Sequence, residues 1–160
     1  MKRLIIYFTF LFFIPCPAFA GQYDSLKIIK VIDGDTLIAI EVATGNEANI
    51  QLLGINAPEI SSNEPFSTEA KKYVENLILN KTVKARYCYE EANKYYCEIY
   101  LNNIIDLSHT LNYVLVQEGF AKVNIDKPLK CSFNESGYQK AEEKAKRNKK
   151  GIWSDSNKMK

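Results

Sequence analysis

The sequence predicts an α+β domain in which a five-stranded β-barrel carries three helices. Three observations lead to this fold class. Short apolar runs between turn residues fill residues 26–55, an amphipathic helical pattern follows them, and two further helical patterns close the chain after a second pair of strands. Residues 21–160 contain no internal repeat and no Pro/Gly-rich linker, so they are expected to form a single domain.

The first three strands are predicted at residues 26–32, 36–42 and 48–55. Asp33-Gly34 separates the first two strands, and Asp-Gly is a strong hairpin signal because glycine adopts a positive φ at little steric cost. Thr44-Gly45-Asn46 separates the second strand from the third. Three strands joined by such short turns are expected to form an antiparallel meander.

A helix is predicted to begin at Thr68, with Ser67 as its N-cap, and to end at Asn80-Lys81. Its apolar positions recur at the spacing of one helix face: Ala70, Tyr73, Val74, Leu77 and Ile78. Two further strands are predicted at residues 82–88 and 95–101, and they form a second hairpin.

The end of the chain is predicted to be mainly helical. A second helix ends at Gly119, which suits the C′ position of a helix. Its apolar face is formed by Leu107, Leu111, Val114 and Leu115. Residues 120–125 are expected to be extended, and a last helix runs from Ser136 to Lys149, with Trp153 beyond it as a packing anchor. Five strands with a helix between the third and the fourth are the arrangement of an OB-fold barrel.

The start of the chain has the organisation of a secretory signal peptide over residues 1–20. A positively charged start precedes an apolar run at residues 4–14, and Ala18-Phe19-Ala20 has the form of a cleavage site. The apolar run is shorter than the ~20 residues of an ordinary membrane span, and an uncleaved anchor is the alternative interpretation. We expect an exported protein, periplasmic or secreted, whose mature chain begins at Gly21.

The charge balance of the mature chain excludes one class of function. The 21 basic residues include Lys2 and Arg3, so removal of the signal peptide leaves 19 basic against 19 acidic residues and a net charge of zero. Bulk binding to nucleic acid needs a surplus of Lys and Arg on one face. We expect a monomer without a membrane span, whose contact with nucleic acid depends on a local site.

The cysteines predict one disulfide in the mature chain. Cys88 and Cys97 flank the tip of the second hairpin, and an oxidising compartment favours a bond between them. Cys131 would then be a leftover thiol able to link a protein partner. Three reduced thiols are the alternative. A zinc site is not expected, because His109 is the only histidine and no C-x-x-C pair is present.

Four motifs occur in an order and spacing that carry a family resemblance. They are "VIDGDT" at residues 31–36, "IQLLGINAPE" at 50–59, "LVQEGFAKV" at 115–123 and "AEEKAKRNKKGIWSD" at 141–155. Together they resemble the staphylococcal nuclease (thermonuclease) family. The resemblance implies an OB-fold barrel with three helices. It also implies a calcium-dependent phosphodiesterase that cuts DNA and RNA.

The resemblance assigns roles to four residues of the first two motifs. Asp35 matches a carboxylate that binds calcium, and Asp33 matches a nearby acidic position. Ala57 stands where a backbone oxygen serves calcium, and Glu59 matches the carboxylate that orients or deprotonates water. Within "VIDGDT", a plain hairpin turn and a metal ligand are compatible interpretations. Calcium takes several oxygen ligands, as this set would provide.

Three departures weaken the implied activity. Gln51 stands where the family has its first arginine, and Asn56 stands where it has a second calcium-binding aspartate. The family's Y-G-R motif is absent from the second hairpin, where Lys94 is the nearest cation to the missing arginine. Arg86 alternates with apolar neighbours, so it is expected to point out of the barrel and cannot easily substitute. Calcium binding is therefore expected to be weak.

Two classes of function remain open from the sequence. The first is an exported, impaired calcium-dependent endonuclease. The alternative is a non-catalytic OB-fold module of the cell envelope that binds nucleic acid, oligosaccharide or protein. The tyrosines around the second hairpin would supply its stacking surface: Tyr87, Tyr89, Tyr95 and Tyr96.

Overall fold

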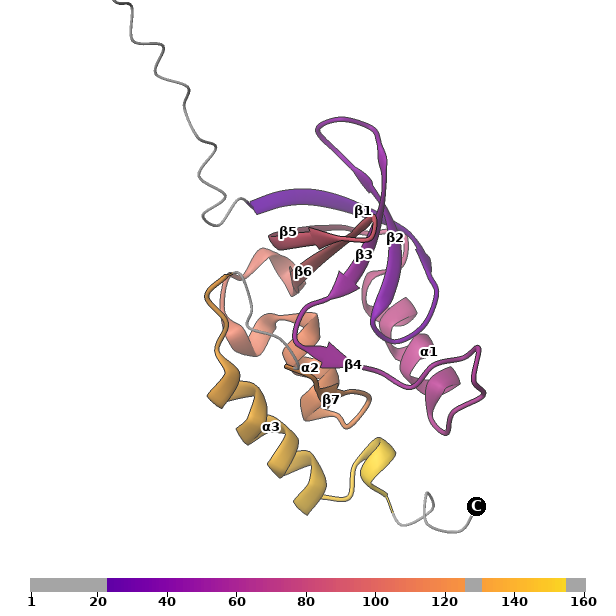
Figure 1. Cartoon of the computed structure of the whole chain (residues 1–160), viewed down its shortest axis with the longest axis vertical. Coiled ribbons are helices and arrows are strands. Elements are labelled where there is room, and N and C mark those ends of the chain that lie inside the picture. The colour runs from indigo at the N-terminus through magenta and orange to yellow at the C-terminus, as the bar shows by residue number, and fades with distance from the viewer. Residues whose placement is uncertain (1–22, 126–130, 155–160) are drawn as a thin grey trace, which may run out of the picture.

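The computed structural model describes residues 23–125 and 131–154, so the expected signal peptide lies outside the described residues. Five strands form a closed barrel in the order β1-β2-β3-β6-β5 (Figure 1). They are β1 (Tyr23–Val31), β2 (Thr36–Glu41), β3 (Glu47–Leu52), β5 (Thr82–Glu91) and β6 (Lys94–Tyr100). Only β3 and β6 pair in parallel within the barrel, and the other pairs are antiparallel. The α+β, OB-fold prediction is confirmed.

Alternation along each strand places the core inside the barrel. The inward positions of the five strands are almost fully buried: Leu26, Ile28, Leu37, Ala39, Ile50, Leu52, Val83, Ala85, Cys97 and Ile99. The helix α1 (Ser67–Ile78) packs against this core through Ala70, Val74 and Ile78. Ser67 is the first residue of α1 and not its cap, because Phe66 occupies the N-cap position with a positive φ of 68°.

The part of the chain that follows β6 packs on one side of the barrel (Figure 1). The predicted second helix is split: Leu107–His109 form a 3-10 turn, Thr110 caps the next helix, and α2 spans Leu111–Gln117. The strand β7 (Lys122–Val123) pairs with β4 (Ile55–Asn56). The last helix α3 (Glu135–Arg147) precedes 3-10 residues at Gly151–Trp153. None of the helices in the described part of the chain is long and apolar enough to cross a membrane.

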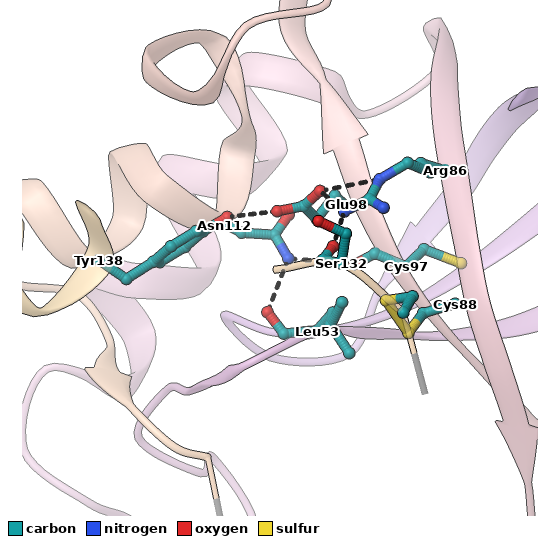
Figure 2. Close-up of a disulfide and its surroundings, with 9 residues drawn as sticks. Leu53, Arg86, Cys88, Cys97, Glu98, Asn112, Ser132 and Tyr138 are labelled. Atoms are coloured by element: carbon teal, nitrogen blue, oxygen red, sulfur yellow. Dashed lines mark hydrogen bonds and ion pairs between the residues drawn. A yellow bond between two sulfur atoms is a disulfide. The ribbon is translucent and has the colours of Figure 1, made fainter. Parts of the chain in front are cut away.

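A buried asparagine fixes α2 against the barrel. The side-chain amide of Asn112 donates hydrogen bonds to the carbonyl oxygens of Leu53 (3.1 Å) and Cys97 (3.0 Å) (Figure 2). The side-chain oxygen of Asn112 accepts one from the Ile99 N–H (3.2 Å). Asn112 is fully buried, so these bonds compensate the lost contact with water. They join α2 to the end of β3 and to β6.

The predicted disulfide between Cys88 and Cys97 is wrong. Cys88 is bonded to Cys131, and Cys97 is a buried free thiol (Figure 2). Cys97 pairs with Tyr87 across β5 and β6, so both side chains face the barrel interior. Cys88 is the extra residue of a β-bulge between Tyr87 and Tyr89, and its side chain reaches the segment before α3. Cys131 is therefore not the free thiol that was expected to link a protein partner.

A buried ion pair lies beside this disulfide (Figure 2). Arg86 points out of the barrel, as its alternation predicts, and its Nε donates to Glu98 Oε2 at 3.1 Å. The guanidinium also donates to the Ser132 carbonyl oxygen (2.8 Å), and the Tyr138 hydroxyl donates to Glu98 Oε1 (3.0 Å). Arg86 thus connects the segment before α3 to the barrel and has a structural role.

Candidate functional site

The turn between β1 and β2 holds the first candidate residues. Asp33 Oδ1 accepts hydrogen bonds from the backbone N–H groups of Asp35 (3.2 Å) and Thr36 (2.8 Å), which fixes the turn. Gly34 does not adopt the positive φ that the hairpin prediction assumed. It is required for close packing, because a Cβ there would lie 2.6 Å from the Ala57 Cβ. Gly34 therefore allows the turn to pack against the segment that contains Ala57.

Asp35 is the buried carboxylate of the candidate site. Only 4% of the residue is exposed, and its Oδ2 accepts a hydrogen bond from the Ala57 N–H at 2.8 Å. Burial raises the pKa of Asp35 from 3.8 to about 7, the Ala57 N–H opposes this rise, and nearby Asp33 adds to it. No ion pair among the described residues compensates the charge of the ionised Asp35 carboxylate.

Thr36 links Asp35 to Gln51. The Thr36 hydroxyl oxygen lies 3.1 Å from Asp35 Oδ1 and 3.2 Å from Gln51 Oε1, and it can donate its single proton to either. Gln51 also pairs with Thr36 in the β2–β3 ladder. Three predicted residues, Asp35, Gln51 and Ala57, are thus brought together. Thr36 was missed, although it is the last residue of the "VIDGDT" motif that suggested the site.

A shallow groove of about 280 Å³ extends from this cluster and is lined in part by Gln51 and Asn56. Tyr96 is the partner of Gln51 in the parallel β3–β6 ladder. The ring of Tyr96 stacks on Tyr89 with centroids 4.4 Å apart and an interplanar angle of 13°. Both tyrosines line the groove, so an aromatic pair stands beside Gln51 on β6.

Lys94, Asn56 and Glu59 lie at the edges of this arrangement. Lys94 is exposed at the tip of the second hairpin, opposite Glu91 and two residues before Tyr96. By alternation it shares the face of Tyr96, but no described contact joins it to Asp35 or Gln51. The Asn56 side chain is exposed on β4.

The Glu59 side chain is held in a surface loop. Its Oε2 accepts hydrogen bonds from the hydroxyl groups of Ser61 and Ser62, each at 3.2 Å. The backbone N–H of Glu64 donates to the Glu59 carbonyl oxygen at 3.2 Å, which closes the loop. Glu59 lies two residues after Ala57 in the sequence, and Ala57 is the residue that bonds to Asp35. The Glu59 side chain is exposed.

Comparison with known proteins identifies the family. A family model described as "Staphylococcal nuclease homologue" matches residues 49–155. The chain belongs to the staphylococcal nuclease family. This match starts within β3 and includes Gln51, Asn56, Ala57 and Glu59, while Asp35 precedes it and is joined to it through the Ala57 hydrogen bond.

Individual relatives of the staphylococcal nuclease family agree with this assignment. A thermonuclease of Staphylococcus hyicus is 28% identical over 139 residues, which cover 82% of this chain and 77% of that protein. An uncharacterized endonuclease of Haemophilus influenzae is 25% identical over 158 residues, covering 98% and 81%. An uncharacterized protein of Methanocaldococcus jannaschii is 32% identical over 157 residues, covering 82% and 72%. The family and these nuclease names support a nuclease-like function.

Proposed function

We propose that this chain is an exported, calcium-dependent phosphodiesterase that cuts DNA or RNA with reduced catalytic power. One observation carries the proposal: the buried Asp35 carboxylate is bonded to Ala57 and linked through Thr36 to Gln51. Among the described residues the desolvated Asp35 carboxylate has no cationic partner, and Gln51, to which Thr36 links it, lines a groove. Such a carboxylate is suited to a functional cation rather than to stability. The family assignment points the chemistry toward phosphodiester hydrolysis.

Asp35 and its sequence-predicted partners offer oxygen ligands of the types that calcium binds. Asp35 would give one carboxylate, Asn56 an amide oxygen and Ala57 a backbone oxygen, and calcium takes oxygen ligands of these types. Asn56 contributes no charge, so affinity should be low. When bound, calcium would supply positive charge to polarise the phosphate and favour deprotonation of water.

The chain's own residues would bind the phosphate and move the proton. Gln51 uses its oxygen toward Thr36, so its side-chain NH₂ group is left to donate to a phosphate oxygen. Glu59 would accept the proton of the attacking water, and Lys94 would approach from the hairpin tip. A neutral amide gives less stabilisation to a developing negative charge than a bidentate arginine does. We expect cleavage at least ~10²-fold slower than with an arginine at this position.

A non-catalytic binding module is the second candidate, and the aromatic pair favours it. The stacked Tyr89–Tyr96 pair lines the groove beside Gln51. Tyr96 is the residue on β6 that pairs with Gln51, so an aromatic ring rather than a cation lies next to Gln51. Stacking on such a ring contributes about 1–3 kcal/mol per base without selecting a sequence. The same groove would then hold a single strand without cutting it.

Export forms part of the proposal and has its own test. The Cys88–Cys131 disulfide suits an oxidising compartment, as an exported protein would meet. Intact-mass measurement of the protein recovered outside the cytoplasm should give a chain that begins at Gly21. A product that retains residues 1–20 would contradict cleavage of a signal peptide.

A phosphodiesterase assay with calcium and with EDTA separates the two functions. We expect slow, calcium-stimulated cleavage of a short DNA or RNA strand, and Asp35→Ala should lower it by about 10²–10³-fold. Glu143→Gln, which removes an exposed charge from α3, is the matched control and should cleave at the wild-type rate. Strand binding without cleavage would establish the binding module. Cleavage that is insensitive to both EDTA and Asp35→Ala would refute the proposed site.

A further inference from the structure

A second and larger pocket, of about 650 Å³, lies at the barrel end where β1 begins and β2 ends. Its walls also include β5 and the start of β6. Tyr89 borders both this pocket and the groove of the candidate nuclease site, but Asp35, Gln51, Asn56 and Glu59 do not line it. Its volume lies within the range of small-molecule sites, about 300–1,000 Å³.

Strand register places two carboxylates on the inward face at this end of the barrel, and a third, exposed carboxylate lines the same pocket. Asp24 pairs with Ala85, and Glu41 pairs with Leu26. Ala85 and Leu26 are fully buried inside the barrel, and residues directly opposite each other in an antiparallel ladder share a face. Glu90 likewise pairs with Tyr95. Asp24, Glu41 and Glu90 all line the pocket.

Two tyrosines form an aromatic wall between these carboxylates. The rings of Tyr87 and Tyr95 meet edge to face, with centroids 5.5 Å apart. Tyr87 pairs with the buried Cys97, which places its ring on the inward face of β5. Its hydroxyl group is buried and has no hydrogen-bond partner within the described residues. The rings of Tyr87 and Tyr95 thus line the pocket together with its carboxylates.

The electrostatics of the pocket are negative. None of the described residues that line it is basic, and no ion pair in the described part of the chain involves Asp24, Glu41 or Glu90. The Glu41 carboxylate accepts a hydrogen bond from the uncharged Thr44 hydroxyl at 2.8 Å. Glu90 is the main cause of a raised pKa at Tyr95, and Glu41 and Asp24 add to the effect of burial in raising that of Tyr87. The carboxylates are thus close enough to act on the rings.

We propose that this pocket binds an aliphatic polyamine. Its ammonium groups would pair with Asp24, Glu41 and Glu90, and its methylene chain would lie against the rings of Tyr87 and Tyr95. Charge complementarity selects a cation, and aromatic faces within about 6 Å add attraction for an ammonium group. A bare metal ion would use the carboxylates but gain nothing from the apolar part of the wall, whereas an amine with methylene groups uses both. This site is independent of the proposed nuclease function.

The test is calorimetric titration of the full chain with spermidine in EDTA at low salt. Asp24→Asn combined with Glu41→Gln should weaken spermidine binding by about tenfold or more, because two charges leave the pocket while its shape is retained. Tyr95→Leu should weaken it several-fold by removing one ring. Glu143→Gln removes an exposed charge far along α3 and should leave the affinity unchanged, as should Asp35→Asn at the other site.

A single variant, NMR mapping and two other cations provide further tests of the polyamine site. If the double variant unfolds, Glu90→Gln alone is the replacement, because Glu90 is exposed and its loss should not disturb the barrel. NMR shifts caused by spermidine should map to Asp24, Tyr87 and Tyr95. Equal affinity of the wild type and the pocket variants would overturn the proposal. So would equally tight binding of calcium or tetramethylammonium, since neither combines N–H donors with a methylene chain.

Discussion

Two buried carboxylates, Glu98 and Asp35, show how differently one barrel uses the same chemical group. Each residue is only 4% exposed. Glu98 accepts hydrogen bonds from the Arg86 guanidinium and from the Tyr138 hydroxyl. Both of its carboxylate oxygens therefore have partners, and one partner is a cation. Asp35 has an amide and a hydroxyl as partners, and the like-charged Asp33 further raises its pKa.

We infer that the difference separates a carboxylate that stabilises the fold from one that, under the proposed function, binds a cation. Glu98 holds β6, β5 and the segment before α3 together through Arg86, Ser132 and Tyr138. Asp35 costs stability when it ionises, because burial is not compensated by charge. Proteins retain such a group where function requires it. Removing each charge should therefore have opposite effects on stability.

The largest expected effect is loss of stability when Glu98 is neutralised. Glu98→Gln leaves the guanidinium of Arg86 partly buried without its counter-charge, and breaking a buried pair in this way costs about 3–5 kcal/mol. Denaturant unfolding measures the loss, with Glu143→Gln on the exposed face of α3 as the control within about 0.5 kcal/mol. A loss below about 1 kcal/mol would mean that the pair does not hold the fold.

Next in size is the disulfide beside that ion pair. Replacing both Cys88 and Cys131 by serine opens a loop with a sequence separation of 43 residues. The loss of chain constraint should cost about 2–4 kcal/mol in the unfolding free energy. Dithiothreitol should destabilise the wild type to a similar extent and leave the double variant unchanged. Peptide mapping that found a bond between Cys88 and Cys97 would instead support the pairing predicted from the sequence.

The smallest expected effect is a partial gain of activity at the Asp35 site. Gln51→Arg with Asn56→Asp should raise single-turnover cleavage by about tenfold or more, because one change adds a bidentate cation and the other a charged ligand. Recovery of the ~10²-fold loss expected at Gln51 should be only partial, since the arginine of the family's Y-G-R motif is still missing from the second hairpin. The two act on one phosphate, so their effects should be coupled. Gln51→Lys with Asn56→Asp tests whether charge alone suffices. A double variant that folds, binds calcium and remains inactive would favour the binding module.

The barrel could be predicted from the sequence because its determinants are local. Alternating apolar residues such as Leu37 and Ala39 define a half-buried strand, and the change from a period of two to the helical stripe of α1 marks the inserted helix. The Asp33-Gly34 turn was also predicted, although Gly34 serves close packing against Ala57 rather than a positive φ.

The disulfide and the role of Arg86 could not be predicted because they depend on distant contacts. Cys88 lies two residues after the outward-facing Arg86 and is the extra residue of a bulge, so it faces away from the inward-facing Cys97. Spacing along the chain therefore favoured the wrong partner. Arg86 was correctly directed out of the barrel, but its contact with Ser132 joins residues 46 apart in sequence. The Asp35 carboxylate is likewise bonded to Ala57, 22 residues further along the chain.

The unfolding free energy of wild type and Asp35→Asn, with EDTA and with calcium, tests the central claim most directly. The pKa of Asp35 is raised in the fold to about 7, so the folded chain holds the proton more tightly and stability falls as pH rises from about 4 to about 7. In EDTA at about pH 8, Asp35→Asn should therefore be more stable than the wild type, by at most about 4 kcal/mol. This gap should close toward about pH 4. Calcium should stabilise the wild type and not the variant. If Asp35→Asn instead destabilises the protein as Glu98→Gln does, or if calcium stabilises both chains equally, Asp35 is a structural carboxylate and not a cation ligand.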